Sequence, residues 1–247
     1  MTISPRLALF ALAAPLALAA CNGGEGEVAE SEPIAAIAAP EGSSWTETVA
    51  VSEYDGYVLG NPEAPIKVVE YASLTCPACA AFAQTGADPL KEEYVSTGVV
   101  SFELRNQVHN VFDLTLARLV RCGAPESFHP LSQQVWLNLA PLQQQMQAGS
   151  QALQGAEGLP PEQLYPLVAE ASGFYDFFAA RGISRDQAAT CLADAASVDA
   201  IGDRSDQQSE EFEVTGTPTF FVNGTKVDGI NWEDLEPVLQ RAGARTE

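Results

Sequence analysis

The sequence has few basic residues: Lys and Arg number 12 against 33 Asp and Glu, so the formal net charge is -21 at pH 7. A chain with this charge repels polyanions, which excludes nucleic acid as a partner. With 247 residues, 46% of them hydrophobic, the chain is long enough for one well-buried domain with an insertion, or for two small domains. We expect one domain.

Histidine is also scarce. The two histidines, His109 and His129, are too few and too far apart in sequence for a metal site or a catalytic triad. A zinc site built on two cysteines would need two further ligands. We therefore expect neither a metal nor a cofactor.

The first 20 residues predict a signal peptide, because Arg6 precedes an apolar run that ends in small side chains. The run, about 14 residues long, is too short for a comfortable membrane span. Its end, Leu18-Ala19-Ala20-Cys21, resembles the bacterial lipobox, so we expect residues 1–20 to be removed and Cys21 to carry lipid. The alternative is an ordinary signal cut near Ala19 or Ala20, which would leave a soluble product. Both place the mature protein outside the cytoplasm, where disulfides persist.

Residues 21–44 predict a flexible acidic tether, since they are rich in Gly, Ala, Glu, Ser and Pro and lack apolar periodicity. A tether of this kind would hold the domain off a membrane.

The strongest chemical signal is the C-x-x-C of Cys76 and Cys79. Pro77 suits the first turn of a helix, which places Cys76 at its cap and Cys79 one turn inside. A helix N-terminus lowers a thiol pKa through its unpaired N–H groups and its dipole. We therefore expect Cys76 to be the nucleophile and Cys79 the resolving thiol of a redox-active disulfide. Half of a zinc site and a structural disulfide are the competing readings.

Strand and helix patterns surround this motif. Residues 45–61 suggest an edge strand and a loop, residues 66–72 a buried β-branched strand, and residues 99–105 a second strand. Gly86 and Pro89 should kink or interrupt the helix that starts at the C-x-x-C. Apolar residues then recur at helical spacing, which predicts a helical insertion over residues 110–205.

The last segment, residues 206–247, returns to β-structure. Asn223-Gly224 predicts a hairpin between strands at 219–222 and 225–228, and a final helix follows at 232–242. This order, with residues 45–109 as the first part, indicates an α/β protein with a thioredoxin fold and an inserted all-helical subdomain. The C-x-x-C is what selects this fold among α/β folds.

Two further residues favour redox chemistry. Pro218 enters a predicted strand, where proline is tolerated mainly at a first residue or an edge. It resembles the cis-proline of thioredoxin-fold proteins, which faces the C-x-x-C, with Thr217 offering backbone hydrogen bonds to a substrate; an ordinary trans proline is the alternative. Glu70 interrupts a buried strand six residues before Cys76. It could take or deliver the proton of the Cys79 thiol, or it could be a solvated edge-strand glutamate.

These motifs resemble the DsbA-like branch of the thioredoxin superfamily over residues 46–242, through Gly60-Asn61-Pro62-Glu63-Ala64-Pro65, Glu70-Tyr71-Ala72-Ser73-Leu74-Thr75-Cys76-Pro77-Ala78-Cys79 and Gly216-Thr217-Pro218-Thr219. The resemblance implies a periplasmic dithiol–disulfide oxidoreductase acting on exported proteins. It implies that Glu70 is the family's buried acid and that a membrane DsbB-like quinone reductase re-oxidises the enzyme.

One position departs from the family pattern. Strongly oxidising members carry Cys-Pro-His-Cys, whose histidine stabilises the thiolate, whereas this chain has Ala78. We expect Cys76 to be acidic but less so, and the protein to be a weaker oxidant than the archetype.

The remaining cysteines, Cys122 and Cys191, lie far apart in the predicted insertion. We expect them to form a structural disulfide between two helices, since closing a loop of about 70 residues could contribute roughly 4 kcal/mol. Two buried free thiols are the alternative.

The sequence therefore predicts a monomeric envelope thiol oxidase, tethered to a membrane by Cys21, whose substrates are cysteine pairs of exported proteins. A disulfide isomerase or reductase of the same fold is one alternative. The other is a non-redox module that binds a peptide beside Pro218 and uses the C-x-x-C as a structural bridge. No separate dimerisation segment, which an isomerase would use, is evident.

Overall fold

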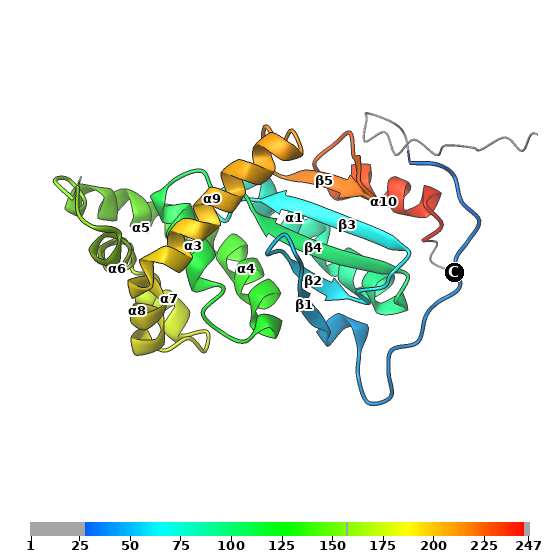
Figure 1. Cartoon of the computed structure of the whole chain (residues 1–247), viewed down its shortest axis with the longest axis horizontal. Helices are drawn as coiled ribbons and strands as arrows, with labels where there is room; N and C mark the ends of the chain where they lie inside the picture. The colour runs from blue at the N-terminus through cyan, green and yellow to red at the C-terminus, as the bar shows by residue number, and fades with distance from the viewer. Residues whose placement is uncertain (1–27, 157, 245–247) are drawn as a thin grey trace, which may run out of the picture.

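The computed structural model describes residues 28–156 and 158–244 and has a mixed six-stranded sheet at its centre. The strand order is β1-β2-β4-β3-β5-β6 (Figure 1). The strands are β1 (Val49–Val51), β2 (Tyr57–Gly60), β3 (Ile66–Ala72), β4 (Val100–Asn106), β5 (Thr219–Val222) and β6 (Thr225–Lys226). β3 and β4 are parallel, and the other pairs are antiparallel. The sheet confirms the predicted α/β class.

The β3 strand forms where the sequence alternates across a pleat. Ile66, Val68 and Ala72 are buried, whereas Lys67 on the opposite side is exposed. β3 pairs with β4 on one side and β5 on the other. It is therefore a central strand, and the turn that follows it lies at the middle of the sheet's end.

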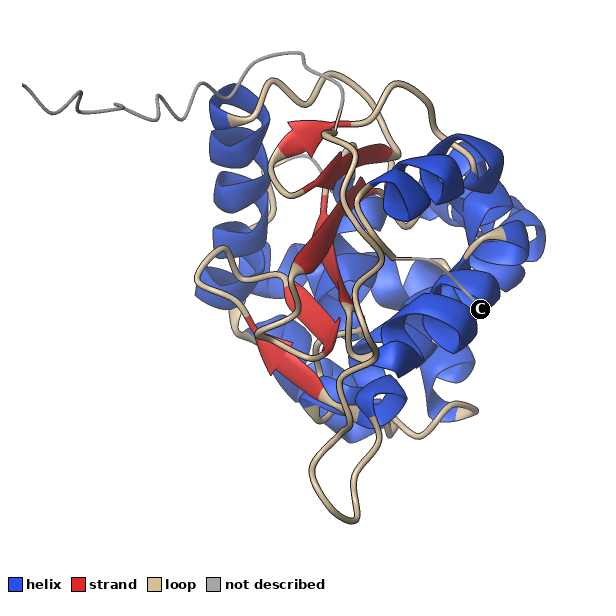
Figure 2. Cartoon of the chain, turned by 90° about the vertical axis from the view of Figure 1, so that its right-hand side faces the viewer, coloured by secondary structure: helices blue, strands red, loops and turns tan. Residues whose placement is uncertain are grey.

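Helices flank the strands on both sides, as Figure 2 shows. After β3 come α1 (Pro77–Thr85), the short α2 (Ala87–Pro89) and a π-helical turn (Leu90–Tyr94), so the helix that begins at the C-x-x-C is interrupted at Gly86 as predicted. α10 (Trp232–Arg241) closes the chain and contacts β5.

Among the described residues, the predicted helical insertion contains seven α-helices between β4 and β5. They are α3 (Val111–Leu119), α4 (Phe128–Leu137), α5 (Leu139–Ala152), α6 (Pro161–Ala171), α7 (Phe174–Ala179), α8 (Arg185–Ala193) and α9 (Ala195–Glu211). α5 to α8 lie away from the sheet, and the long α9 leads the chain back to it (Figure 1). α9 extends past the predicted boundary at residue 205. The second strand of the hairpin, β6, ends at Lys226 and is shorter than predicted.

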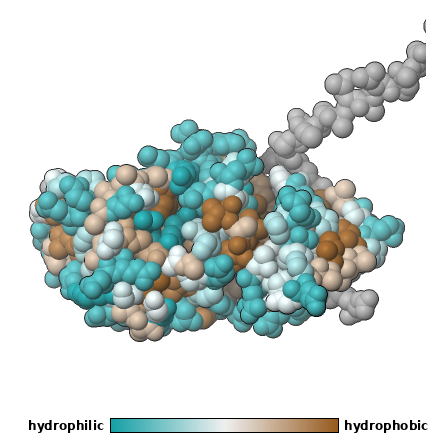
Figure 3. Space-filling model, turned by 60° about the horizontal axis from the view of Figure 1, so that its bottom comes forward, coloured by the Kyte–Doolittle hydropathy of each residue, from teal (hydrophilic) through white to brown (hydrophobic). Residues whose placement is uncertain are grey.

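A continuous hydrophobic core joins the sheet to the insertion. It includes Val68, Phe82 and Phe220 around the sheet, and Phe174 and Phe178 within the insertion, all at most 3% exposed. The side seen in Figure 3 is mainly hydrophilic, with brown hydrophobic patches near its centre and right. No helix among the described residues is long and apolar enough to cross a membrane.

The described part of the predicted tether differs from a flexible chain. Residues 28–39 run along the end of the sheet away from the insertion (Figure 1), and Val28 and Ile34 pack against the core. The N–H groups of Ser31 and Ile34 donate to the carbonyls of Arg241 (2.9 Å) and Gly243 (3.0 Å). Carbonyls at a helix end lack intrahelical donors, so the end of α10 can accept them. Composition alone could not reveal this tertiary pairing.

Candidate active site

The C-x-x-C occupies the turn between β3 and α1. Cys76 is the N-cap of α1, with an extended backbone, and Pro77 is the first helical residue. The Cys76 N–H donates to the carbonyl of Ser73, 3.3 Å away, which closes the turn. Cys79 lies one turn inside the helix with no exposed surface, whereas Cys76 is half-buried. Both are free thiols in this structure. A reagent or client can therefore reach Cys76 but not Cys79.

The surroundings of Cys76 favour its thiolate. Its pKa is lowered to about 5, chiefly because the Cys79 thiol donates a hydrogen bond to it. The backbone N–H groups of Ala78 and Cys79, at the start of α1, also stabilise the anion, while partial burial opposes it. When protonated, the Cys76 thiol donates to the carbonyl of Thr217 at 3.3 Å. Cys76 is a nucleophile at neutral pH.

The environment of Cys79 does the opposite. Burial raises the pKa of the Cys79 thiol far above its ordinary value, and its hydrogen bond to Cys76 and the charge of Glu70 raise it further. A thiolate at Cys79 is therefore a poor leaving group and a scarce nucleophile unless a neighbouring group handles its proton.

Glu70 lies on β3 and shares the inner face of the sheet with Val68 and Ala72. It is 1% exposed and sits on a central strand, so the reading of a solvated edge-strand glutamate is wrong. Burial, and next the charge of Cys76, raise the pKa of Glu70 to about 8. Its Oε1 has no hydrogen-bond partner among the described residues. Glu70 is therefore mainly protonated at neutral pH and has an oxygen available for proton exchange.

A cavity of about 390 Å³ borders Glu70 on this face of the sheet. Its walls include Phe82 of α1, Leu104 of β4, and His129 and Trp136 of α4. Burial lowers the pKa of His129 to about 4, so its ring is neutral, and Nε2 lies 2.9 Å from the carbonyl of Tyr57. The cavity has room for water beside the carboxyl group.

The loop before β5 approaches Cys76 from the other side. β5 pairs with β3 so that Thr219 lies opposite Tyr71, which brings Thr217 and Pro218 to the end of β3. The Thr217–Pro218 peptide bond is cis, and the carbonyl of Thr217 is the one that faces the Cys76 sulfur. The structure thus brings together Cys76, Cys79, Glu70, Thr217 and Pro218.

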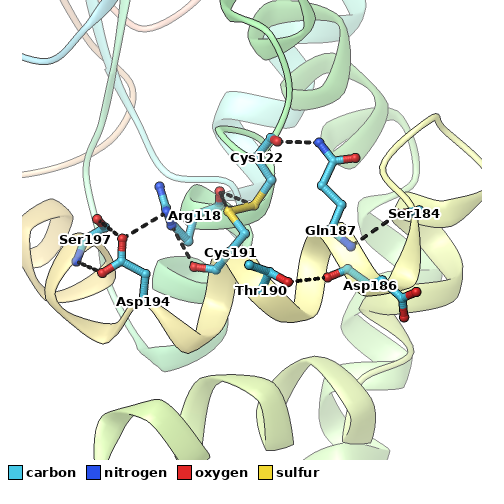
Figure 4. The surroundings of a disulfide bond; sticks show 9 residues. All are labelled: Arg118, Cys122, Ser184, Asp186, Gln187, Thr190, Cys191, Asp194 and Ser197. Atoms are coloured by element: carbon cyan, nitrogen blue, oxygen red, sulfur yellow. Dashed lines mark hydrogen bonds and ion pairs between the residues drawn. A yellow bond between two sulfur atoms is a disulfide. The ribbon is translucent and has the colours of Figure 1, made fainter.

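Cys122 and Cys191 lie apart from this site and form a disulfide (Figure 4). The bond joins the segment after α3 to α8, with 5.9 Å between the Cα atoms, so the reading of two free thiols does not hold. Nearby, Arg118 donates from Nε to the carbonyl of Cys191 (3.1 Å), and Gln187 donates to the carbonyl of Cys122 (2.6 Å). The predicted lipid attachment at Cys21 lies outside the described residues.

Two residues at the active-site turn were not predicted from the sequence. Asp113 of α3 and Trp136 of α4 both hydrogen-bond to the turn that precedes Cys76. The sequence signal around Asp113, with Asn110 three residues earlier, is that of a helix cap, and Asn110 does cap α3. Nothing in that signal indicates a contact across the fold.

The described residues contain no group of three or more His, Cys, Asp or Glu placed to hold a metal ion. Residues 52–241 match the family model described as Thioredoxin, which is most of the chain. The chain belongs to the thioredoxin family. A protein-disulfide isomerase from Novosphingobium aromaticivorans is 31% identical, and its crystal structure gives a TM-score of 0.68 over 75% of this chain and 96% of its own.

Other thioredoxin-family relatives carry related names. A putative protein-disulfide oxidoreductase of Rickettsia bellii is 25% identical over 82% of this chain and 70% of its own length. A similarly named protein of Rickettsia typhi is 27% identical over 75% of this chain, which spans 61% of that relative. Wolbachia pipientis alpha-DsbA1, 22% identical with a TM-score of 0.60 over 76% of this chain and 91% of its own, shares the DsbA-like fold. The names of these relatives and the cysteine pair of the present chain together identify the present chain as a thiol–disulfide oxidoreductase.

Proposed function

We propose that the protein oxidises cysteine pairs of exported proteins through a disulfide between Cys76 and Cys79. The lowered pKa of Cys76, about 5, carries this proposal. A stabilised thiolate stabilises the reduced enzyme, and an enzyme whose reduced form is stabilised is a better oxidant. A stable structural bridge would need no such thiolate, so the same observation argues against the non-redox binding module.

The reaction begins when a client thiolate attacks Cys76 of the oxidised enzyme. A mixed disulfide forms on Cys76, and Cys79 leaves. Because the pKa of the Cys79 thiol is strongly raised, Cys79 departs with a proton, and Glu70, protonated at neutral pH, is placed to deliver it. A second client thiolate then attacks the client sulfur and releases Cys76 as a thiolate. The client loses two electrons, and Cys76 and Cys79 gain them.

The proposed location is the periplasm, with the domain tethered to a membrane through lipidated Cys21. The leader sequence supports it, because the apolar run ends at a lipobox-like Leu18-Ala19-Ala20-Cys21. Re-oxidation is assigned to a membrane quinone reductase of the DsbB kind, which would accept the two electrons from the reduced pair. The working form is taken to be a monomer.

A disulfide isomerase is the second candidate function, favoured by the name of the 31% identical relative from Novosphingobium aromaticivorans. Two refolding assays separate the candidates. With a fully reduced client, an oxidase restores native disulfides stoichiometrically with its own Cys76–Cys79 bond. With a scrambled, oxidised client, an isomerase restores them catalytically from its reduced form. We expect the first activity to exceed the second; activity on the scrambled client alone would overturn the oxidase assignment.

A further inference from the structure

The turn before Cys76 is held by side chains from the helical insertion, not by the thioredoxin part alone. The Asp113 carboxylate accepts hydrogen bonds from the Ser73 hydroxyl (2.6 Å), the Leu74 N–H (2.9 Å) and the His109 N–H (3.0 Å). Trp136 donates from Nε1 to the carbonyl of Ser73 at 2.9 Å. α3 and α4 therefore grip both the donor and the acceptor groups of this turn.

These contacts extend directly to the cysteines. The Ser73 hydroxyl accepts from the Thr75 N–H (3.1 Å), and the Ser73 carbonyl accepts from the Cys76 N–H. The Ser73 N–H also lies against the Cys79 sulfur, where it favours the thiolate. A shift of the turn would therefore displace both Cys76 and the Ser73 N–H that contacts Cys79.

Asp113 is an expensive residue to bury. It is 1% exposed, and burial raises its pKa to about 6 although the hydroxyl of Ser73 and the N–H groups of His109 and Leu74 lower it. Capping of α3 does not explain this burial, because Asn110 already caps that helix. A buried carboxylate is costly unless it has another partner or task. Three donors converge on the two carboxylate oxygens, and an amide has only one acceptor oxygen to offer them.

We propose that Asp113 is a positioning residue for thiol–disulfide exchange, through which the helical insertion fixes the turn Ser73–Thr75 and thereby the reactive geometry of Cys76. The inference rests on the proposed exchange through Cys76. Asp113 touches neither cysteine, so it acts through the turn. The insertion then contributes to the geometry of the active site, because α3 carries Asp113.

The test is the variant Asp113→Asn in the full chain, compared with Asp194→Asn. Asp194 also lies in the insertion, where it caps α9 and pairs with Arg118, away from the active-site turn. The pH dependence of Cys76 alkylation and the reduction potential against glutathione are measured for both, with thermal unfolding as the measure of stability.

We expect Asp113→Asn to raise the alkylation midpoint of Cys76 by about one pH unit, which is a tenfold loss in the thiolate-to-thiol ratio, and to lower the reduction potential. Asp194→Asn should change neither. A downward shift would mean that Asp113 acts only as a repelling negative charge, and an unchanged midpoint would mean that it is structural. Either result would overturn the proposal.

A second variant guards against a folding defect. Trp136→Phe keeps an aromatic ring but removes the donor to Ser73, and we expect a smaller shift in the same direction. If Asp113→Asn does not fold, the test depends on Trp136→Phe alone. An unchanged alkylation midpoint in Trp136→Phe would then overturn the proposal. A wild-type midpoint near the free thiol value of roughly 8.5 would instead refute the proposed function, so the two failures can be told apart.

Discussion

Cys76 and Cys79 are one helical turn apart, yet their surroundings move their thiol pKa values in opposite directions. The hydrogen bond from the Cys79 thiol is the largest cause of the low Cys76 pKa. We predict that Cys76 is alkylated with a midpoint near pH 5 and that Cys79→Ala raises this midpoint. Cys79→Ser, which keeps a hydroxyl donor, should raise it less. Equal midpoints in the two variants would contradict the assignment of the donor.

Glu70 makes a separate prediction. In the oxidising direction it should supply the proton for the Cys79 leaving group, so Glu70→Gln should slow oxidation of a reduced client at pH 7 by roughly 10²-fold, the range of general acid catalysis. At pH 7 the carboxyl of Glu70, with a pKa of about 8, is mostly neutral. Its replacement should therefore leave the Cys76 alkylation midpoint unchanged. Single-turnover stopped-flow and alkylation measure the two; a shifted midpoint with normal turnover would refute this role.

The first turn of α1 sets the poise of the disulfide. Ala78 contributes its backbone N–H to the Cys76 thiolate but no side-chain charge. We predict that Ala78→His raises the reduction potential, because an imidazolium near the helix N-terminus would stabilise the reduced form further. Equilibration with glutathione gives the value, and Ala81→His, on the exposed side of the same helix, is the matched control. An unchanged or lower potential in Ala78→His would sink this explanation.

The disulfide between Cys122 and Cys191 acts on another part of the molecule, with a sequence separation of 69 residues. We predict that the double variant Cys122→Ser, Cys191→Ser loses about 4 kcal/mol of unfolding free energy in the chain-entropy model and retains the low Cys76 pKa. Urea denaturation measures the loss. In the double variant Cys76→Ser, Cys79→Ser, Cys122 and Cys191 should both remain unalkylated when the intact mass is measured after denaturing alkylation without reductant. Alkylation of both would exclude the bridge.

The elements that the sequence predicts well are those whose signals are local. The β-branched run at residues 66–72 marks β3, Pro77 marks the start of α1, and Asn223-Gly224 marks the hairpin. Asp113 was not predicted, because its partners Ser73 and Leu74 are 40 and 39 positions away. A local pattern carries no information about such pairing, which depends on how the insertion packs.

At the scale of the whole molecule, the docked segment at residues 28–39 changes the expected tether. Only a few residues would then separate a lipidated Cys21 from Val28. Because a fully extended chain spans at most about 3.6 Å per residue, the domain would lie close to the membrane. The segment contacts Thr97, just before the start of β4, whereas the active site follows the C-terminal end of the parallel strand β3. The two therefore lie at opposite ends of the sheet. The composition of the segment predicted a flexible chain, because composition does not show that two apolar side chains, Val28 and Ile34, pack against the core.

The central claim is that Cys76 exchanges disulfides with client proteins and that Cys79 completes the exchange. The most direct measurement is trapping in cells that export the full chain carrying Cys79→Ala. We predict that mixed disulfides accumulate on Cys76, disappear on reduction, and contain clients with cysteine pairs when analysed by mass spectrometry. The control Cys76→Ala, Cys79→Ala should trap none. If the single variant also traps no client, the claim is contradicted.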